Sequence, residues 1–117
     1  MSSCRIAIAS SDGNTVDLHF GQATSLLIYE IGDDKVDFIE EREVRLIPGE
    51  AAHAEANMEI FADALHDCSA IFVRRIGQRS LRYLFERKIT AFEVTFSLNH
   101  IFNTLLKNRQ RGRVRIL

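Results

Sequence analysis

His19 is the residue whose type and setting point most directly to chemistry. It lies in the run Val-Asp-Leu-His-Phe-Gly over residues 16–21, directly before Phe20 and Gly21. An imidazole nitrogen suits iron, and a glycine lets a ligand approach the backbone closely. His19 is therefore the leading candidate for a ligand contact, against the alternative of a loop histidine that is only solvated or hydrogen-bonded.

Cationic and polar side chains later in the chain could serve an anionic ligand. Arg74, Arg75 and Arg79 could neutralise the periphery of a preformed anionic cluster, or could form only surface salt bridges. Alternation along the strand expected there places Arg74 and Arg75 on opposite faces of the sheet. Ser97 is expected to cap a helix, whose N-terminus attracts anions, with His100 in its first turn.

Five strands and three helices must position these residues. Apolar runs predict strands, and an apolar stripe at helical spacing predicts helices. The strands are expected over 4–10, 26–31, 36–44, 70–76 and 89–94, and the helices over 50–66, 80–88 and from 97 onward. Residues 11–21 show no apolar periodicity and are expected to form a loop, and the second helix is expected to bury one face made of Leu81, Leu84 and Phe85.

The order of the elements predicts an α/β fold with a five-stranded mixed sheet. A hairpin turn at 32–35 followed by right-handed crossovers gives the strand order 3-2-1-4-5, with strand 2 antiparallel. Ligands in such sheets gather outside the carboxyl ends of the strands where the order reverses, here between strands 1 and 4. This selects residues 11–21, 77–80 and 95–100, which include Asp12, Gly21 and Gly77.

Length and composition limit the possible classes of protein. The 117 residues, 46% of them hydrophobic, suit one globular domain over 1–108 followed by a basic tail over 109–117. The last eleven residues hold five cations and no acid, which leaves 10 basic against 16 acidic residues elsewhere. Such a body predicts no nucleic-acid binding, although the tail could bind an anionic partner or be only solvated. No apolar run is long enough to span a membrane and no secretory signal is evident, so a cytoplasmic protein is expected.

The remaining cysteines and histidines offer no self-contained metal site. Cys4 and Cys68 form no CxxC pair and begin strands at the edge of the sheet opposite the expected cleft, so both are expected to pack. His53 and His66 are 13 positions apart and cannot share one helix face, so they are expected at the surface. Any metal centre would therefore arrive preassembled.

Enzymatic alternatives have weaker support. A hydrolase built on Ser10 or Ser11 with Asp17 and His19 would lack the GxSxG elbow. A two-metal nuclease needs converging carboxylates that the first strand does not carry, and there is no GxGxxG or phosphate-binding loop.

The opening of the chain resembles a known family. Residues 6–13, Ile-Ala-Ile-Ala-Ser-Ser-Asp-Gly, followed by Val16-Asp17, His-Phe-Gly at 19–21 and Ala23, resemble the start of the dinitrogenase iron-molybdenum cofactor biosynthesis family, which includes NifX, NafY and the C-terminal domain of NifB. Residues 67–77 and the short strand after Lys88 resemble its later blocks, so the resemblance covers nearly the whole chain. The Gly-Gln-Arg-Ser sequence at 77–80 departs from the family's glycine-rich segment, and the basic tail is not a family signature.

The resemblance implies a ribonuclease H-like three-layer fold, which agrees with the strand order, and a non-enzymatic function. It implies a binding or carrier protein that transiently holds an iron-sulfur cofactor precursor or the iron-molybdenum cofactor, with metallocluster assembly or nitrogenase proteins as partners. The alternative is a protein-interaction or regulatory module of the same fold without cofactor. By the resemblance His19 contacts the cofactor and is its metal ligand; the remaining expected contacts are Phe20, Gly21, Asp12, Gly77, Arg79, Ser97 and His100.

Overall fold

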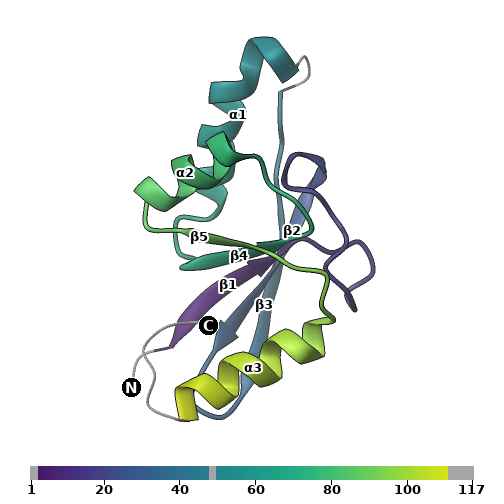
Figure 1. Cartoon of the computed structure of the whole chain (residues 1–117), viewed down its shortest axis with the longest axis vertical. Coiled ribbons are helices and arrows are strands. Elements are labelled where there is room, and N and C mark those ends of the chain that lie inside the picture. The colour runs from purple at the N-terminus through teal and green to yellow at the C-terminus, as the bar shows by residue number, and fades with distance from the viewer. Residues whose placement is uncertain (1–2, 48–49, 111–117) are drawn as a thin grey trace.

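A single mixed sheet forms the centre of the molecule (Figure 1). The computed structural model describes residues 3–47 and 50–110, and five strands lie within them. They are β1 (Cys4–Ile8), β2 (Ser25–Ile31), β3 (Val36–Glu43), β4 (Ala70–Val73) and β5 (Thr90–Glu93), in the order β3-β2-β1-β4-β5. β2 is antiparallel to β1 and β3, whereas β4 is parallel to β1 and β5. The predicted strand order and the antiparallel β2 are confirmed.

Helices cover both faces of the sheet, which gives three layers. α1 (Glu50–Ala64) and α2 (Gln78–Glu86) lie on one face, and α3 (Leu98–Gln110) lies on the other (Figure 1). Each face has its own apolar core because successive strand residues point to opposite sides. Ala7 and Ile71 pack with Phe61 and Leu84 in one core, whereas Ile8 and Phe72 pack with Ile101 and Leu105 in the other.

The sequence determines α3 through its start and its apolar stripe. The Oγ atom of Ser97 accepts a hydrogen bond from the His100 N–H at 3.1 Å, as a residue that caps a helix does. Leu98, Ile101 and Leu105 are all buried. The predicted cap and stripe are both confirmed.

Several elements are shorter than the sequence predicted. β1 ends at Ile8 instead of residue 10, and β4 ends at Val73 instead of residue 76. Beyond these ends the backbone pairs with the loop at 11–24: the Ala9 carbonyl accepts from the N–H of Asp17, and the Arg74 N–H donates to the Leu18 carbonyl at 2.9 Å. The loop replaces the neighbouring strand, so the sheet ends earlier. β3, β5 and α1 also end one or two residues short of their predicted limits.

α2 differs from its prediction at both ends. It begins at Gln78 after Gly77 as N-cap, so residues 77–80 form a helix start where a loop was expected. Leu84 is buried, whereas the Phe85 side chain is 67% exposed, so the predicted burial of Phe85 was wrong. Consecutive helix residues point about 100° apart, and a helix above the edge strand β5 has no further strand to cover its outer side.

A charged network closes the amino end of the parallel strands. The Arg42 guanidinium donates to both carboxylate oxygens of Asp67, at 2.7 and 3.1 Å, and Arg5 donates to the same carboxylate at 2.9 Å. Arg42 also donates to the Ala64 carbonyl at the end of α1. The network therefore links β1, β3 and the segment between α1 and β4.

Two predictions fall outside the residues that the structure describes. α3 continues through residue 108 to Gln110, and residues 111–117, with Arg111, Arg113 and Arg115, are not described. The limit of the basic tail and its function therefore stay predictions, as does the placement of the His53 side chain. Of the helices within the described ranges, none is long and apolar enough to cross a membrane.

Candidate functional site

The loop at 11–24 crosses the carboxyl ends of β1 and β4. At the α3 side, the Val16 N–H donates to the Phe96 carbonyl at 3.1 Å, and the Leu98 N–H donates to the Asn14 carbonyl at 2.9 Å. At the α2 side, the Phe20 N–H donates to the Arg75 carbonyl at 2.8 Å. The loop thus brings the predicted segments 11–21 and 95–100 together and extends to the residues just before Gly77.

Residues 16–20 are an extended stretch with alternating burial. Val16 and Phe20 are buried and Leu18 is half-buried, whereas Asp17 and His19 are exposed. This is the period of two that a half-buried strand shows, so the expectation of no apolar periodicity in the loop was wrong here. His19 is presented to solvent between two side chains that anchor the backbone.

Phe20 is the stronger of these anchors. Its ring stacks on Phe61 of α1 with the centroids 4.0 Å apart, at the start of the short 3-10 helix η1 (Phe20–Gln22). This packing contact fixes the backbone at His19, and the contact of Phe20 with a cofactor stays a prediction.

The backbone of the segment that holds Arg74 and Arg75 pairs with the backbone on both sides of His19. His19 and Arg75 form a parallel bridge, and the side chains of Arg74 and Arg75 are both exposed. Within the described part of the chain, neither arginine has an ion-pair partner. β4 ends before both arginines, so the strand from which their opposite orientation was predicted does not reach them, and that orientation stays a prediction.

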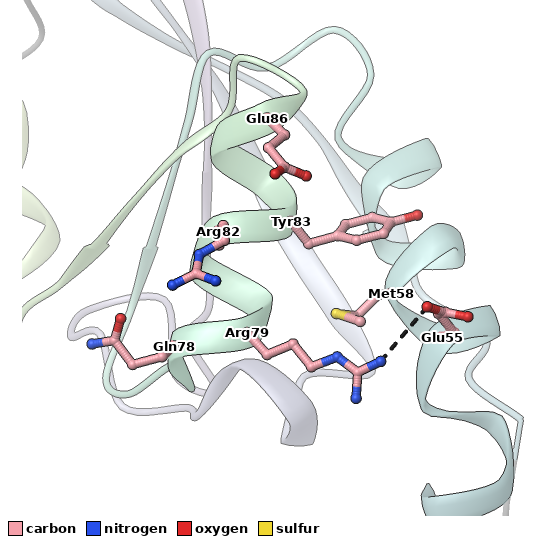
Figure 2. Close-up of a pocket in the computed structure, with 7 residues that line it drawn as sticks. All are labelled: Glu55, Met58, Gln78, Arg79, Arg82, Tyr83 and Glu86. Atoms are coloured by element: carbon pink, nitrogen blue, oxygen red, sulfur yellow. Dashed lines mark ion pairs between the residues drawn. The ribbon is translucent and has the colours of Figure 1, made fainter.

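The start of α2 adds an open, donor-rich surface. Gly77 is its N-cap without a side-chain cap, so the first-turn N–H groups lack that partner. A Cβ atom added at Gly77 or at Gly21 would meet no atom within 4 Å, so both glycines border open space. Arg79, in the first turn, reaches across to Glu55 of α1 with N and O 3.6 Å apart (Figure 2).

His100 and Ser97 lie at the other end of the loop. The His100 ring packs against Phe96 with centroids 4.5 Å apart, and both side chains are exposed. The Ser97 hydroxyl is used as the helix cap. Both stay predicted contacts, on the α3 side of the loop.

The acidic residues of the loop have structural partners. The Asp12 carboxylate accepts from the N–H groups of Asn14 and Thr15 at 2.8 and 3.0 Å, which lowers the pKa of Asp12 to about 2. It also accepts from the Ser10 hydroxyl, and the Asp17 carboxylate accepts from the hydroxyl and the N–H of Ser11. The hydroxyls considered for a hydrolase thus bind the two carboxylates and help to shape the loop.

The site offers one imidazole rather than a set of metal ligands. In the described ranges no group of three or more His, Cys, Asp and Glu side chains could hold a metal ion. Cys68 is buried, as predicted, and its burial raises the pKa of the thiol to about 12. Cys4 packs against the core on the opposite face of the sheet. Neither thiol joins His19, so this arrangement suits one bond to a centre that is already assembled.

Comparison with known proteins gives a family for this fold and site. Residues 2–105 match the model of the family described as "Dinitrogenase iron-molybdenum cofactor". Protein NifX of Klebsiella pneumoniae is 32% identical over 92 residues, which cover 79% of this chain and 57% of that protein. Protein NifX of Sinorhizobium fredii (strain NBRC 101917 / NGR234) is 30% identical over 94 residues, which cover 77% and 59%. The chain therefore spans less than three-fifths of the length of these relatives.

A solved structure agrees with the architecture. The structure titled "Crystal structure of PH0822" superposes with a TM-score of 0.63 and 21% identity, covering 95% of this chain and 92% of that one. At this identity the likeness establishes the shared fold alone. The family match covers most of the chain, including the loop that carries His19, and the chain belongs to the dinitrogenase iron-molybdenum cofactor family.

Proposed function

We propose that this chain is a non-enzymatic carrier that transiently binds an iron-sulfur precursor of the iron-molybdenum cofactor, or the cofactor itself, at His19. The observation that carries the proposal is the exposed side chain of His19 on a backbone that is held by its pairing to Arg75 and by the Phe20–Phe61 stack. Family membership and the two relatives named NifX support a function in the assembly of this cofactor.

The chemistry of His19 suits a metal cluster as cargo. A neutral imidazole binds iron through one ring nitrogen, and exposure of His19 lets a large ligand reach it. A resident iron-sulfur cluster is usually held by four cysteine thiolates. A single protein ligand gives fewer bonds to break, which favours release to a recipient.

The charges around His19 suit an anionic cargo. Arg75, whose backbone pairs with that of His19, supplies a guanidinium group, and the first turn of α2 supplies backbone N–H groups after Gly77. Gly21 and Gly77 leave the surface open for close approach. These groups would orient the cluster periphery while His19 binds the metal.

The test is anaerobic loading of the purified chain. The parent chain, His19→Ala and the control His66→Ala are each incubated with isolated iron-molybdenum cofactor and, separately, with an iron-sulfur precursor cluster, then passed through gel filtration. His66 is an exposed histidine near the amino end of β4, so its variant controls for loss of any surface imidazole. Iron and molybdenum per chain and visible absorbance are measured.

We expect the parent and His66→Ala to bind about one cluster per chain and His19→Ala to bind at least about tenfold more weakly, a loss of about 1.4 kcal/mol or more. Circular dichroism should be the same for all three. Equal binding by His19→Ala would remove His19 from the site, and failure of the parent to bind either cluster would overturn the carrier function.

A further inference from the structure

The positive charge of the folded body is concentrated in one segment. Residues 74–88, from the end of β4 through α2, hold six cations and one acid, Glu86, whereas the whole chain has a net charge of −1. The cations are Arg74, Arg75, Arg79, Arg82, Arg87 and Lys88, and all six side chains are exposed. We call this segment the α2 face.

The cations of the α2 face differ from those elsewhere in the body. The four other cations before residue 100, Arg5, Lys35, Arg42 and Arg45, each form an ion pair with a carboxylate. Within residues 3–47 and 50–110, the α2 face has an ion pair only at Arg79, whose link to Glu55 is long and exposed on both sides. An exposed pair of this kind contributes little and is easily exchanged for another carboxylate.

An exposed aromatic ring lies beside Arg82, one of these cations. Phe85 is 67% exposed, and it lines a hollow of about 280 Å³ with the half-buried side chains of Leu81 and Ala91 and the exposed Arg82. A second hollow of about 370 Å³ lies on the other side of α2, where Met58 points from α1 toward α2 and Tyr83 points from α2 toward α1 (Figure 2). α2 is thus a ridge with a hollow on either side, and Arg82 lines both hollows, whereas Arg87 and Lys88 line another hollow beside Asp67.

We propose that the α2 face is a docking surface for a partner protein that presents acidic side chains around an apolar recess for Phe85. Exposed aromatic residues and arginines are the residue types most enriched at the centres of protein interfaces. The charge complementarity supplies steering and register, and the burial of Phe85 supplies affinity. Phe85 lies in the last turn of α2, whereas the proposed cofactor contacts lie at the start of this helix, so we expect docking not to depend on cofactor binding.

The same observations favour a protein over a nucleic acid as the occupant. Phe85 and Leu81 lie on the outer side of a helix beside an apolar hollow, with no run of further exposed rings on α2 to stack successive bases. A phosphate backbone would use the arginines and leave Phe85 in water.

The test places a photoreactive phenylalanine analogue at position 85 of the full chain, produced in the organism that encodes it. The control carries the same analogue at position 38, because Phe38 is also exposed, at 56%, but lies on the opposite edge strand β3. After irradiation, the partner and its cross-linked segment are identified by mass spectrometry. The measurement is repeated with Arg79→Glu/Arg82→Glu, with His19→Ala, and at 50 and 500 mM salt.

We expect a protein adduct at position 85 with at least about tenfold higher yield than at position 38, joined to a segment rich in Asp and Glu. The yield should fall at least about fivefold with the charge reversal and at high salt, and should be unchanged in His19→Ala. The proposal is overturned by no adduct, by an adduct with nucleic acid or with a second copy of this chain, by a partner segment without acidic residues, or by insensitivity to the charge reversal. Loss of the adduct in His19→Ala would overturn the independence of the surface from the cofactor site.

Discussion

The rings of Phe20 and Phe61 stack with their centroids 4.0 Å apart and their planes at 29°, and this contact joins the loop at 11–24 to α1. Phe20 directly follows His19, so the contact fixes the backbone of the candidate ligand. Both rings are buried, Phe20 at 6% and Phe61 at 2% exposure. The packing of one core therefore positions a residue that itself lies in solvent.

We expect Phe20→Ala to destabilise the protein by about 3 kcal/mol and to loosen the loop, because it removes a buried ring and its stacking partner. Phe20→Leu, which keeps much of the apolar volume, is expected to cost about half as much or less. Urea unfolding measures both, and amide exchange at residues 18–20 reports the loop. A Phe20→Ala variant within about 1 kcal/mol of the parent would show that the stack contributes little.

The Asp67 network predicts a loss of stability in acid. The pKa of Asp67 lies well below its usual range because Arg42, and then Arg5, donate to the carboxylate. The folded chain thus holds this proton more weakly than the unfolded chain. The charged Asp67 carboxylate therefore contributes fully to the free energy of unfolding above the unfolded-state pKa of about 4. This contribution is lost as the pH falls below that value toward the folded-state pKa.

We expect Asp67→Asn to lower stability by about 2 kcal/mol at pH 7, and the difference from the parent to shrink below about pH 4. Thermal unfolding between pH 2.5 and 7 gives this comparison. Glu43→Gln is the control, because the Glu43–Arg45 pair is largely exposed and should change stability by less than about 0.5 kcal/mol. A difference for Asp67→Asn that stays constant with pH would contradict the assignment.

Lys88 predicts a stabilising substitution. It follows α2 with a φ of 64°, and the N–H groups of Lys88 and Ile89 bind the carbonyls of Phe85 and Leu84, as in a Schellman motif. Glycine adopts this conformation without a steric penalty. We expect Lys88→Gly to raise stability by about 0.5–1 kcal/mol after the entropy of the unfolded glycine is included, whereas Lys88→Ala keeps the strain. Chemical unfolding measures the stability of both variants and the parent. A Lys88→Gly variant no more stable than Lys88→Ala would refute the prediction.

Cys68 is expected to be unreactive in the folded protein. Its burial raises the pKa of the thiol to about 12, and only the thiolate reacts readily with alkylating agents. Iodoacetamide should modify the half-buried Cys4 at least about tenfold faster than Cys68, as measured by mass spectrometry of the peptides, and the difference should vanish in denaturant. We expect Cys68→Ala to lower stability by about 1–2 kcal/mol and to leave cluster binding unchanged. Loss of cluster binding with an unchanged thermal transition would place Cys68 at the site.

The sheet and its helices could be predicted because their signals are local and repeated. The stripe of Leu98, Ile101 and Leu105 repeats over about two turns, and the order of strands follows from a hairpin and two right-handed crossovers. The strand ends could not be predicted in the same way. Arg74 and Arg75 belong to a run with strand character, but their backbone pairs with residues 18–20. This pairing depends on the tertiary structure and not on the local sequence.

The candidate site was only partly readable from the sequence. His19 stands out by its type, and its exposure agrees with a site, but the next residue, Phe20, is anchored by Phe61, 41 positions further along the chain in another element. The alternation of apolar residues at Val16, Leu18 and Phe20 is a signal for an extended, half-buried stretch. The polar turn that precedes it made this signal hard to recognise. The exposure of Phe85 had no such signal, because it depends on the position of α2 above the edge strand.

Backbone hydrogen bonds join the loop at 11–24 to the segments that follow the strands. The N–H and carbonyl groups of Val16, Leu18 and Phe20 pair with those of Phe96, Arg74 and Arg75. Every residue type except proline supplies both groups, so the exposed side chains between the anchors can change through evolution while the imidazole stays in place. Related chains can thus diverge in the side chains that this loop exposes without rebuilding the scaffold.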